Sequence, residues 1–389
     1  MSNLLRSRRA KAVAAIATAG LSLTALVATG NPSGADPKQL SANAIRGTGS
    51  DTTQDILGAL AGEANGHLYD PARSSQASGY EQLISFDATG SACISTRAPG
   101  ASVDRPNGSG AGVTLLSRAI NNVQHPTPNC GGGTKTVSGL VQFARSSSGP
   151  ASGSGLTYVP FGVDAVGFAY YANGVTPVTT LTTQQLTDLY HDGPQNIGGV
   201  DIIPCPIQPN SGTYRFWLSK LGYPDAQSST QLPEVVAATA DCGAALQEND
   251  ANALATRGAQ SQFAGKQLVI GFSAANFVAQ TNGVAASQIP PGGVVDLGAI
   301  DALGKPYTGN ITAPPIAPAS GFYGSTYGRT VYNVVSSSLL ALPGNNHIKT
   351  MFVGPTSGVC SASGTISDFG FLPATNCGVT TITGGFSGV

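Results

Sequence analysis

The chain has 389 residues, of which 41% are hydrophobic and only 10% are charged, and its formal net charge is −1. This balance argues against a nucleic-acid-binding protein or a protein of anionic membrane surfaces, because both need a basic surface. Apolar runs recur along the chain, which argues against disorder, and the length is sufficient for two lobes with separate cores.

The N-terminus has the pattern of a signal peptide. Basic residues from Arg6 to Lys11 precede an uncharged apolar run, Ala12 to Ala28, and Ser33 and Ala35 form a small-x-small cleavage site. An uncleaved anchor is the alternative, but Asn-Pro-Ser-Gly at 31–34 breaks a helix, so we favour cleavage near Ala35. No cysteine for a lipid anchor lies near this site. We therefore expect a secreted or extracytoplasmic protein with 15 basic and 20 acidic residues.

Strands and helices alternate along the rest of the chain, which predicts α/β architecture with mainly parallel sheets. In chain order the expected strands are Gln82–Phe86, Val137–Phe143, Val166–Tyr171, Val200–Ile203 and Leu268–Phe272. Thr182 and Gln185 form a capping box at the start of a helix. The Pro- and Gly-rich stretch from Gln288 to Ser320 predicts an irregular loop or crossing.

Three Gly- and Ser-rich turns precede apolar residues at helical spacing, namely Gly47–Thr52, Asn107–Gly112 and Asn210–Thr213. A helix start exposes unpaired N–H groups, and nearby hydroxyls add donors, so each turn can hold an anion. Each turn is also an ordinary helix cap when taken singly, with Asp51 as the expected N-cap of the first helix. A fourth segment, Phe143–Ser148, ends a strand with one arginine and three serines.

The chain contains six cysteines: Cys93, Cys130, Cys205, Cys242, Cys360 and Cys377. An even number in an exported chain indicates disulfides. Among the many possible connectivities we favour sequential pairing, 93 with 130, 205 with 242 and 360 with 377, because each pair closes a local loop. No Cys-x-x-Cys occurs and the four histidines are scattered, so we expect neither a metal site nor another cofactor.

The order of these segments resembles the phosphate-binding-protein branch of the type II periplasmic solute-binding superfamily. Four turns resemble ligand-binding segments of that family: its first Gly-rich loop (Gly49–Thr52), its Gly-Ser-Gly-Ala-Gly loop (Gly108–Gly112), its strand-turn (Phe143–Ser148) and its helix start (Asn210–Phe216). Other segments resemble its two crossings between lobes (Leu156–Phe168, Ile270–Phe272) and its closing elements (Tyr323–Val335, Asp368–Pro373). The resemblance extends over nearly the whole mature chain.

The resemblance implies two α/β lobes, each with a mainly parallel sheet, joined by two hinge strands around a ligand cleft. The implied division is a signal peptide over 1–35, the first lobe over 36–160, the second over 161–275 and a return to the first over 276–389. It also implies a monomeric protein without enzymatic activity that delivers phosphate to an ABC-type permease. The implied ligand residues are Ser50, Asp51, Thr52, Ser109, Gly110, Arg145, Ser146, Ser147, Ser211, Gly212 and Thr213.

Two positions depart from the family pattern and leave the ligand open between phosphate and another oxyanion or small polar molecule. Ser147 stands near the place of an Asp that accepts the proton of hydrogen phosphate, and Ile207 replaces an Arg before the helix start. Without the Asp, discrimination against fully ionised oxyanions such as sulfate should weaken, because no acceptor remains for a protonated ligand. Arg105 and Arg145 are the candidates for a replacement cation.

Two other functions stay open. The first is a secreted hydrolase of phosphate esters, although no Gly-x-Ser-x-Gly, Ser-x-x-Lys or His-Glu-x-x-His motif occurs. The second is a cell-envelope protein that keeps the fold without the ligand, which the altered charged positions would favour.

Overall fold

A computed structural model describes residue 36 and residues 44–69, 83–97, 100–223, 231–344 and 346–389. The expected signal peptide and its cleavage site lie outside these residues. Among the helices of the described residues, none has the length and apolarity needed to cross a membrane.

A group of parallel strands forms one end of the main sheet. β1 (Ile45–Gly49) lies between β4 (Leu83–Ser85) and β9 (Phe143–Ser146) and runs parallel to both. Every residue of β1 and β9 is buried, as expected for strands that are covered on both faces. Because the strands are parallel, β1 and β9 end at the same edge of the sheet, where the turns with Ser50 and Ser147 follow.

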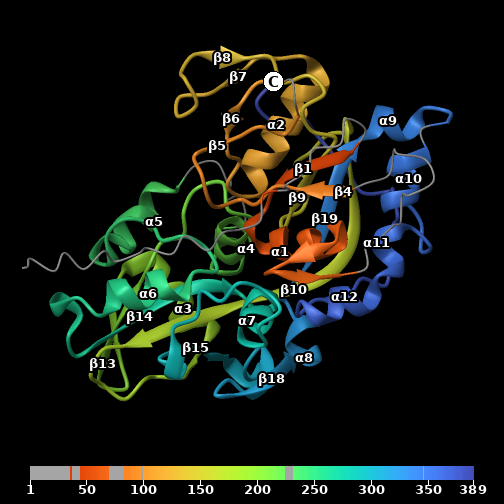
Figure 1. Ribbon diagram of the computed structural model, residues 1–389. Coiled ribbons are helices and arrows are strands. Elements are labelled where there is room, and N and C mark those ends of the chain that lie inside the picture. Colours follow the sequence, from red (N-terminus) through yellow and green to blue (C-terminus); the bar gives the residue numbers. More distant parts are fainter. Residues whose placement is uncertain (1–35, 37–43, 70–82, 98–99, 224–230, 345) are drawn as a thin grey trace, which may run out of the picture. The chain divides into compact units, whose positions relative to one another are not determined.

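The 17-residue strand β10 (Leu156–Ala172) connects this group to a second group of strands (Figure 1). Its first part pairs antiparallel with β19 (Gly328–Ser336), which also pairs with β9. Its second part pairs with β14 (Lys266–Ser273) and β15 (Val295–Leu297), and β14 continues to β13 (Val200–Pro204) and β12 (Gln195–Ile197). The expected α/β class is confirmed, with a mixed sheet because the pairs made by β10 are antiparallel.

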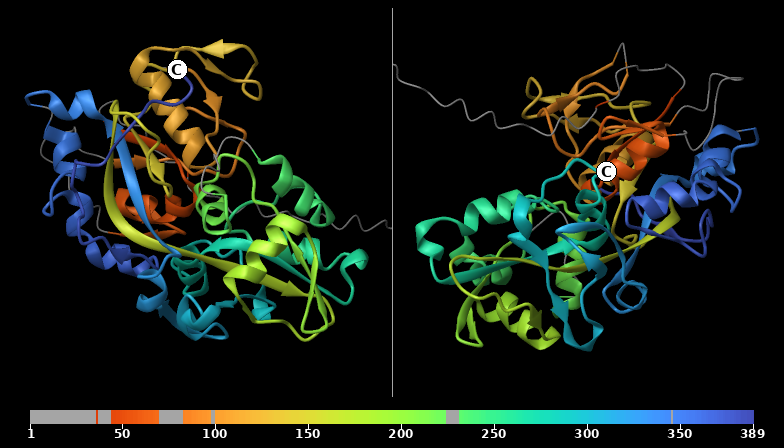
Figure 2. Two further views of the ribbon diagram at one scale, coloured as in Figure 1. Left: turned by 180° about the vertical axis from the view of Figure 1, so that it is seen from behind. Right: turned by 60° about the horizontal axis from the view of Figure 1, so that its bottom comes forward.

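The apolar side chains form three buried clusters. One surrounds the second group of strands and includes Trp217, and the other two pack on the strands of the first group. In one of these, α10 (Asn346–Phe352), α11 (Gly358–Ser361) and α12 (Ser363–Asp368) cover β1 and β9, as Figure 2 shows.

The expected return of the chain to the first lobe after residue 275 stays a prediction. The buried clusters show on which group of strands the later residues pack. Buried residues from Val295 to Tyr327 belong to the cluster of the second group. The chain therefore rejoins the strands of the first group at β19.

Helices begin after the expected turns. They are α1 (Gln54–Ala61), α2 (Ser109–Asn121), α3 (Thr183–Asp192) and α4 (Gly212–Lys220). The capping box of Thr182 and Gln185 is confirmed at α3. Asp51 as N-cap was wrong: Asp51–Thr53 form the 3₁₀ turn η1, and Thr53 precedes α1. The carboxylate of Asp51 instead accepts a hydrogen bond from Asn249 Nδ2 at 2.9 Å.

Four of the five expected strands are present, and two expectations need correction. Of Val137–Phe143 only Phe143 lies in a strand; Val137 and Leu140 are buried in a turn, so burial and not strand pairing explains this apolar run. The stretch from Gln288 to Ser320 is not irregular throughout. It contains β15 and an antiparallel hairpin of β17 (Tyr307–Asn310) and β18 (Ala313–Pro318).

Shorter elements complete the described chain. The helices are α5 (Pro233–Ala238), α6 (Ala251–Gly258), α7 (Ala274–Thr281), α8 (Ser320–Tyr323) and α9 (Ser337–Ala341), and the 3₁₀ turns are η2 (Ala240–Cys242), η3 (Ser261–Phe263), η4 (Pro291–Gly293) and η5 (Asp301–Leu303). The strands are β2 (Glu63–Ala64), β3 (His67–Leu68), β5 (Cys93–Ile94), β6 (Val103–Asp104), β7 (His125–Pro126), β8 (Thr134–Lys135), β11 (Thr180–Leu181), β16 (Ala299–Ile300), β20 (Leu372–Pro373) and β21 (Thr383–Gly384).

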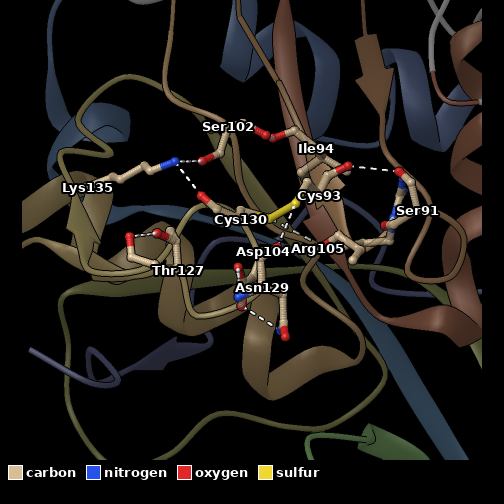
Figure 3. Close-up of a disulfide and its surroundings, with 12 residues drawn as sticks. Ser91, Cys93, Ile94, Ser102, Asp104, Arg105, Thr127, Asn129, Cys130 and Lys135 are labelled. Atoms are coloured by element: carbon tan, nitrogen blue, oxygen red, sulfur yellow. Dashed lines mark hydrogen bonds between the residues drawn. A yellow bond between two sulfur atoms is a disulfide. The ribbon is translucent and has the colours of Figure 1, made fainter.

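The sequential disulfide pairing is confirmed for all three pairs. Cys93–Cys130 joins β5 to the loop between β7 and β8, where Lys135 Nζ donates to the carbonyl oxygens of Cys130 and Ser102 (Figure 3). Cys205 and Cys242 are buried within the cluster around the second group of strands. Cys360–Cys377 joins α11 to the segment after β20.

Candidate functional site

Four chain-distant turns meet in the interior of the protein. They follow β1, precede α2, follow β9 and precede α4, and they contribute five buried hydroxyls that we call the hydroxyl cluster: Ser50, Thr52, Ser109, Ser147 and Thr213. The cluster therefore brings together residues from all four segments in which the sequence predicted ligand contacts.

Ser147 is the centre of one part of the cluster. Its hydroxyl accepts a hydrogen bond from Ser50 Oγ at 3.0 Å and lies 3.3 Å from Ser109 Oγ, and its backbone N–H donates to Ser109 Oγ at 3.0 Å. In this arrangement the hydroxyls bind one another directly.

Glycines let the turns approach one another closely. A Cβ atom at Gly212 would lie 2.4 Å from Ser147 Oγ and 2.5 Å from Ser109 Oγ. At Gly108, where φ is +100°, a Cβ would lie 2.3 Å from the carbonyl oxygen of Asn210. The contact between the turns thus depends on the absence of side chains at these two positions.

For the oxyanion ligand expected from the sequence, Gly212→Ala should weaken binding. The added methyl group forces the turns apart or displaces two hydroxyls, and overpacking of this kind costs about 1–3 kcal/mol of folding free energy. The part of this cost that falls on the ligand-bound arrangement lowers the affinity, by at most about 150-fold. Titration calorimetry with phosphate measures this loss. Gly364→Ala in α12 is the matched control, because nothing lies within 4 Å of a Cβ there. Equal affinities of the two variants would contradict the assignment of Gly212 to the site.

Arg329 lies beside the other part of the cluster. Its Nη2 donates to Thr213 Oγ1 at 2.9 Å and to Thr52 Oγ1 at 3.2 Å, and these two hydroxyls are 3.3 Å apart. The same nitrogen forms an ion pair with Asp164 Oδ2 at 2.8 Å, and Nε donates to that oxygen at 3.0 Å. Nη1 is buried without a hydrogen-bond partner among the described residues.

The two arginines proposed from the sequence as replacement cations are bound elsewhere. Arg145 donates to the carbonyl oxygens of Ser50, Gly49 and Phe86 and to Ser85 Oγ, and burial lowers its pKa to about 10. Arg105 pairs with Asp36 and donates to the carbonyl oxygens of Ser91 and Asp87. Arg329 is instead the arginine that donates to hydroxyl groups of the cluster in the described part of the chain.

Two buried carboxyl groups lie near the cluster. Burial raises the pKa of Asp51 well above its usual value, and the neighbouring Glu248 raises it further. Burial also raises the pKa of Glu248, whereas the Thr213 hydroxyl and Arg329 oppose this shift. Glu248 Oε1 accepts a hydrogen bond from Gln208 Nε2 at 3.3 Å, while Oε2 is buried with no partner in the described part of the chain.

The remaining residues predicted for the site hydrogen-bond to the backbone of nearby turns. Ser146 Oγ donates to the carbonyl oxygen of Ser148, and Ser211 caps α4 by accepting from Tyr214 N–H. The N–H of Gly110 donates to the carbonyl oxygen of Asn210. Ile207, which stands where the family has an arginine, is a buried core residue.

A cavity of about 90 Å³ adjoins the cluster at Ser109. Gly110, Ser146, Tyr158 and the guanidinium-bearing Arg215 also line it. This volume is large enough for more than one water molecule, so it offers space for a small polar ligand next to the hydroxyls.

Sequence reasoning missed the charged residues around the cluster, Asp164, Glu248 and Arg329. Asp164 and Arg329 are isolated charges in apolar strands, and they are direct partners in the antiparallel register of β10 and β19. This strand register brings the pair together, and no local sequence pattern marks it. Glu248 lies in no recognisable motif. Backbone hydrogen bonds hold its segment beside the start of α4: the N–H of Gln208 donates to the carbonyl oxygen of Leu246, and the N–H of Leu246 donates to that of Pro206.

The sequence matches no protein-family model and no curated protein sequence. Among solved structures, an ABC-type phosphate transport receptor from Vibrio cholerae is similar, with 15% identity, a TM-score of 0.47 and coverage of 84% of this chain and 99% of that one. A phosphate-binding protein from Stenotrophomonas maltophilia is also similar, with 12% identity, a TM-score of 0.44 and coverage of 86% and 91%. Over most of its length the chain thus aligns with structures of phosphate-binding proteins.

Proposed function

We propose that the protein is an extracytoplasmic solute-binding protein that holds an oxyanion, with phosphate as the first candidate, at the hydroxyl cluster and the cavity beside it. Delivery of the ligand to an ABC-type permease by a monomer is part of this proposal, as is the division of the chain into two lobes around the site. The observation that carries it is the convergence of four turns, far apart in the sequence, on one buried set of hydroxyls.

The chemistry of the cluster fits an oxyanion. Hydroxyls donate hydrogen bonds, the N-termini of α2 and α4 add the positive ends of two helix dipoles, and Arg329 adds a cation. These donors come from five separate segments of the chain, and their convergence supports the binding of one small anion.

The hydrolase alternative lacks this kind of support. The partners of Ser50, Ser109 and Ser147 are other hydroxyls and backbone groups. A serine nucleophile needs a base within hydrogen-bond reach. His191, for comparison, stacks on Tyr223 and bonds the carbonyl oxygen of Leu221. One observation favours the envelope-protein alternative, namely the direct hydrogen bonds between the hydroxyls. Calorimetric titration with oxyanions distinguishes this alternative from a binding protein.

Calorimetric titration of the mature protein with phosphate, sulfate, arsenate and molybdate tests the proposal. We expect saturable binding of at least one oxyanion, and thermal stabilisation of about 3 kcal/mol at a ligand concentration of 100 times Kd. Absence of heat and of stabilisation with all four anions would overturn oxyanion binding and favour the envelope protein. Turnover of a phosphomonoester would favour the hydrolase.

A further inference from the structure

Glu248 is a fully buried carboxyl group with one unused oxygen at the edge of the proposed site. Oε1 is held by Gln208 Nε2, and the N–H of Glu248 donates to Gln208 Oε1 at 2.6 Å. Oε2 has no hydrogen-bond partner in the described part of the chain. A buried polar atom of this kind is costly unless a ligand, a water or a proton satisfies it.

The charges that face Glu248 do not compensate an ionised carboxylate. Asp51 of η1 adds a second acidic group, and Arg329 of β19 is already paired with Asp164 of β10. Ser211 and Thr213 at the start of α4 offer hydroxyls, and Thr213 also offers its N–H, but an oxyanion bound at α4 would compete for the same donors. An anion and an ionised Glu248 would therefore repel each other in a buried environment.

We infer that Glu248 is a further ligand-binding residue of the proposed site, and that it binds the oxyanion in its protonated form, with Oε2–H as the donor. Binding then takes up one proton from solution, which stays on Glu248 while the anion accepts its hydrogen bond. This inference rests on the proposed function. In the family pattern an Asp carboxylate accepts the proton of hydrogen phosphate. Glu248 has the opposite role, because its protonated carboxyl group donates a hydrogen bond to the ligand. Fully ionised oxyanions are therefore suitable ligands.

The raised pKa of Glu248 supports this assignment and gives the sign of the pH dependence. Above its pKa the free protein carries an ionised Glu248, so binding must add a proton and the affinity falls as pH rises. Below its pKa the proton is already present and the affinity becomes independent of pH. We expect a slope of about tenfold in affinity per pH unit on the alkaline side.

Sulfate is the appropriate probe, because it is a dianion in neutral and mildly acidic solution, so the ligand itself takes up no proton and any uptake belongs to the protein. Calorimetric titration in two buffers of different ionisation enthalpy measures affinity and proton uptake together. For the unmodified protein we expect tighter binding at lower pH and uptake of about one proton on the alkaline side. Glu248→Gln keeps an acceptor for Gln208 and a donor for the anion, so it should bind at every pH without proton uptake.

Glu234→Gln is the matched control, because Glu234 is exposed on α5 and the same charge is removed. It should retain the pH slope and the proton uptake. Asp51→Asn and Asp55→Asn test two further acids, because burial raises the pKa of both and that of Asp55 to about 7. If either of these variants loses the uptake and Glu248→Gln keeps it, the assignment to Glu248 is overturned.

Infrared difference spectra of the unmodified protein provide a measurement that does not depend on folding of a variant. Sulfate addition on the alkaline side should produce a protonated-carboxyl C=O band, and absence of this band overturns the inference. Binding without proton uptake also overturns it, while the proposed function stands. If neither the unmodified protein nor Glu248→Gln binds any of the four oxyanions, both the inference about Glu248 and the proposed function are overturned.

Discussion

Arg329→Met should lower the free energy of unfolding by about 3–5 kcal/mol, because it leaves Asp164 as an uncompensated buried charge. The side chain of Asp164 is 0% exposed, and Arg329 supplies two of its hydrogen bonds. Ser273 Oγ and the N–H of Ala275 supply the others, at 2.9 and 3.0 Å. Chemical denaturation of the variant and the unmodified protein measures the difference.

Arg215→Met is the control for this prediction, since Arg215 makes a single exposed hydrogen bond to the carbonyl oxygen of Gly149. It should change stability by less than about 0.5 kcal/mol. The double variant Arg329→Met/Asp164→Asn should recover part of the loss, because the amide carries no charge, its oxygen can accept from the N–H of Ala275, and its NH2 group can donate to the Ser273 hydroxyl. A loss below about 1 kcal/mol in Arg329→Met, or no recovery in the double variant, would contradict the ion pair's structural role.

Removal of the Cys205–Cys242 disulfide by substitution of both cysteines with alanine is expected to cost about 4 kcal/mol. This value follows from the loop-closure entropy of a loop with a sequence separation of 37 residues. Both sulfurs lie in the core cluster, so their loss adds a packing cost. Urea denaturation under oxidising conditions measures the loss.

Cys93–Cys130 is a matched comparison for that prediction, because its sequence separation is also 37 residues. The entropic cost is therefore the same, but Cys93 is only half-buried and the pair lies outside the core clusters. The alanine pair at 93 and 130 should be the less destabilised of the two variants. The opposite order would show that burial of the sulfurs does not determine the difference.

The residues of the turns were accessible to sequence reasoning because local patterns mark them. A Gly- and Ser-rich turn before an apolar helical period predicted the starts of α2 and α4, and the order of the turns pointed to Ser50, Ser147 and Thr213. The cysteine pairing was predictable for a related reason, since each pair closes a short stretch of chain.

The charged residues could not be predicted in this way, because their partners are distant in the sequence. Arg329 and Asp164 are separated by 165 residues, and a strand register joins them. Arg145 was expected at the ligand, yet its guanidinium donates to the carbonyl oxygens of Gly49, Ser50 and Phe86 at the ends of β1 and β4, which local sequence does not reveal. The same limitation explains Val137–Val141, where apolar residues fill a buried turn and not a strand.

The hydrogen bonds among Ser50, Ser109 and Ser147 have a consequence for the energetics of recognition. These side chains already satisfy part of one another's hydrogen-bonding capacity, so a ligand that binds here replaces existing hydrogen bonds and does not add wholly new ones. The enthalpy released on binding should consequently be modest. Net attraction must come from charge, and a neutral sugar or polyol of similar size would gain little from the exchange.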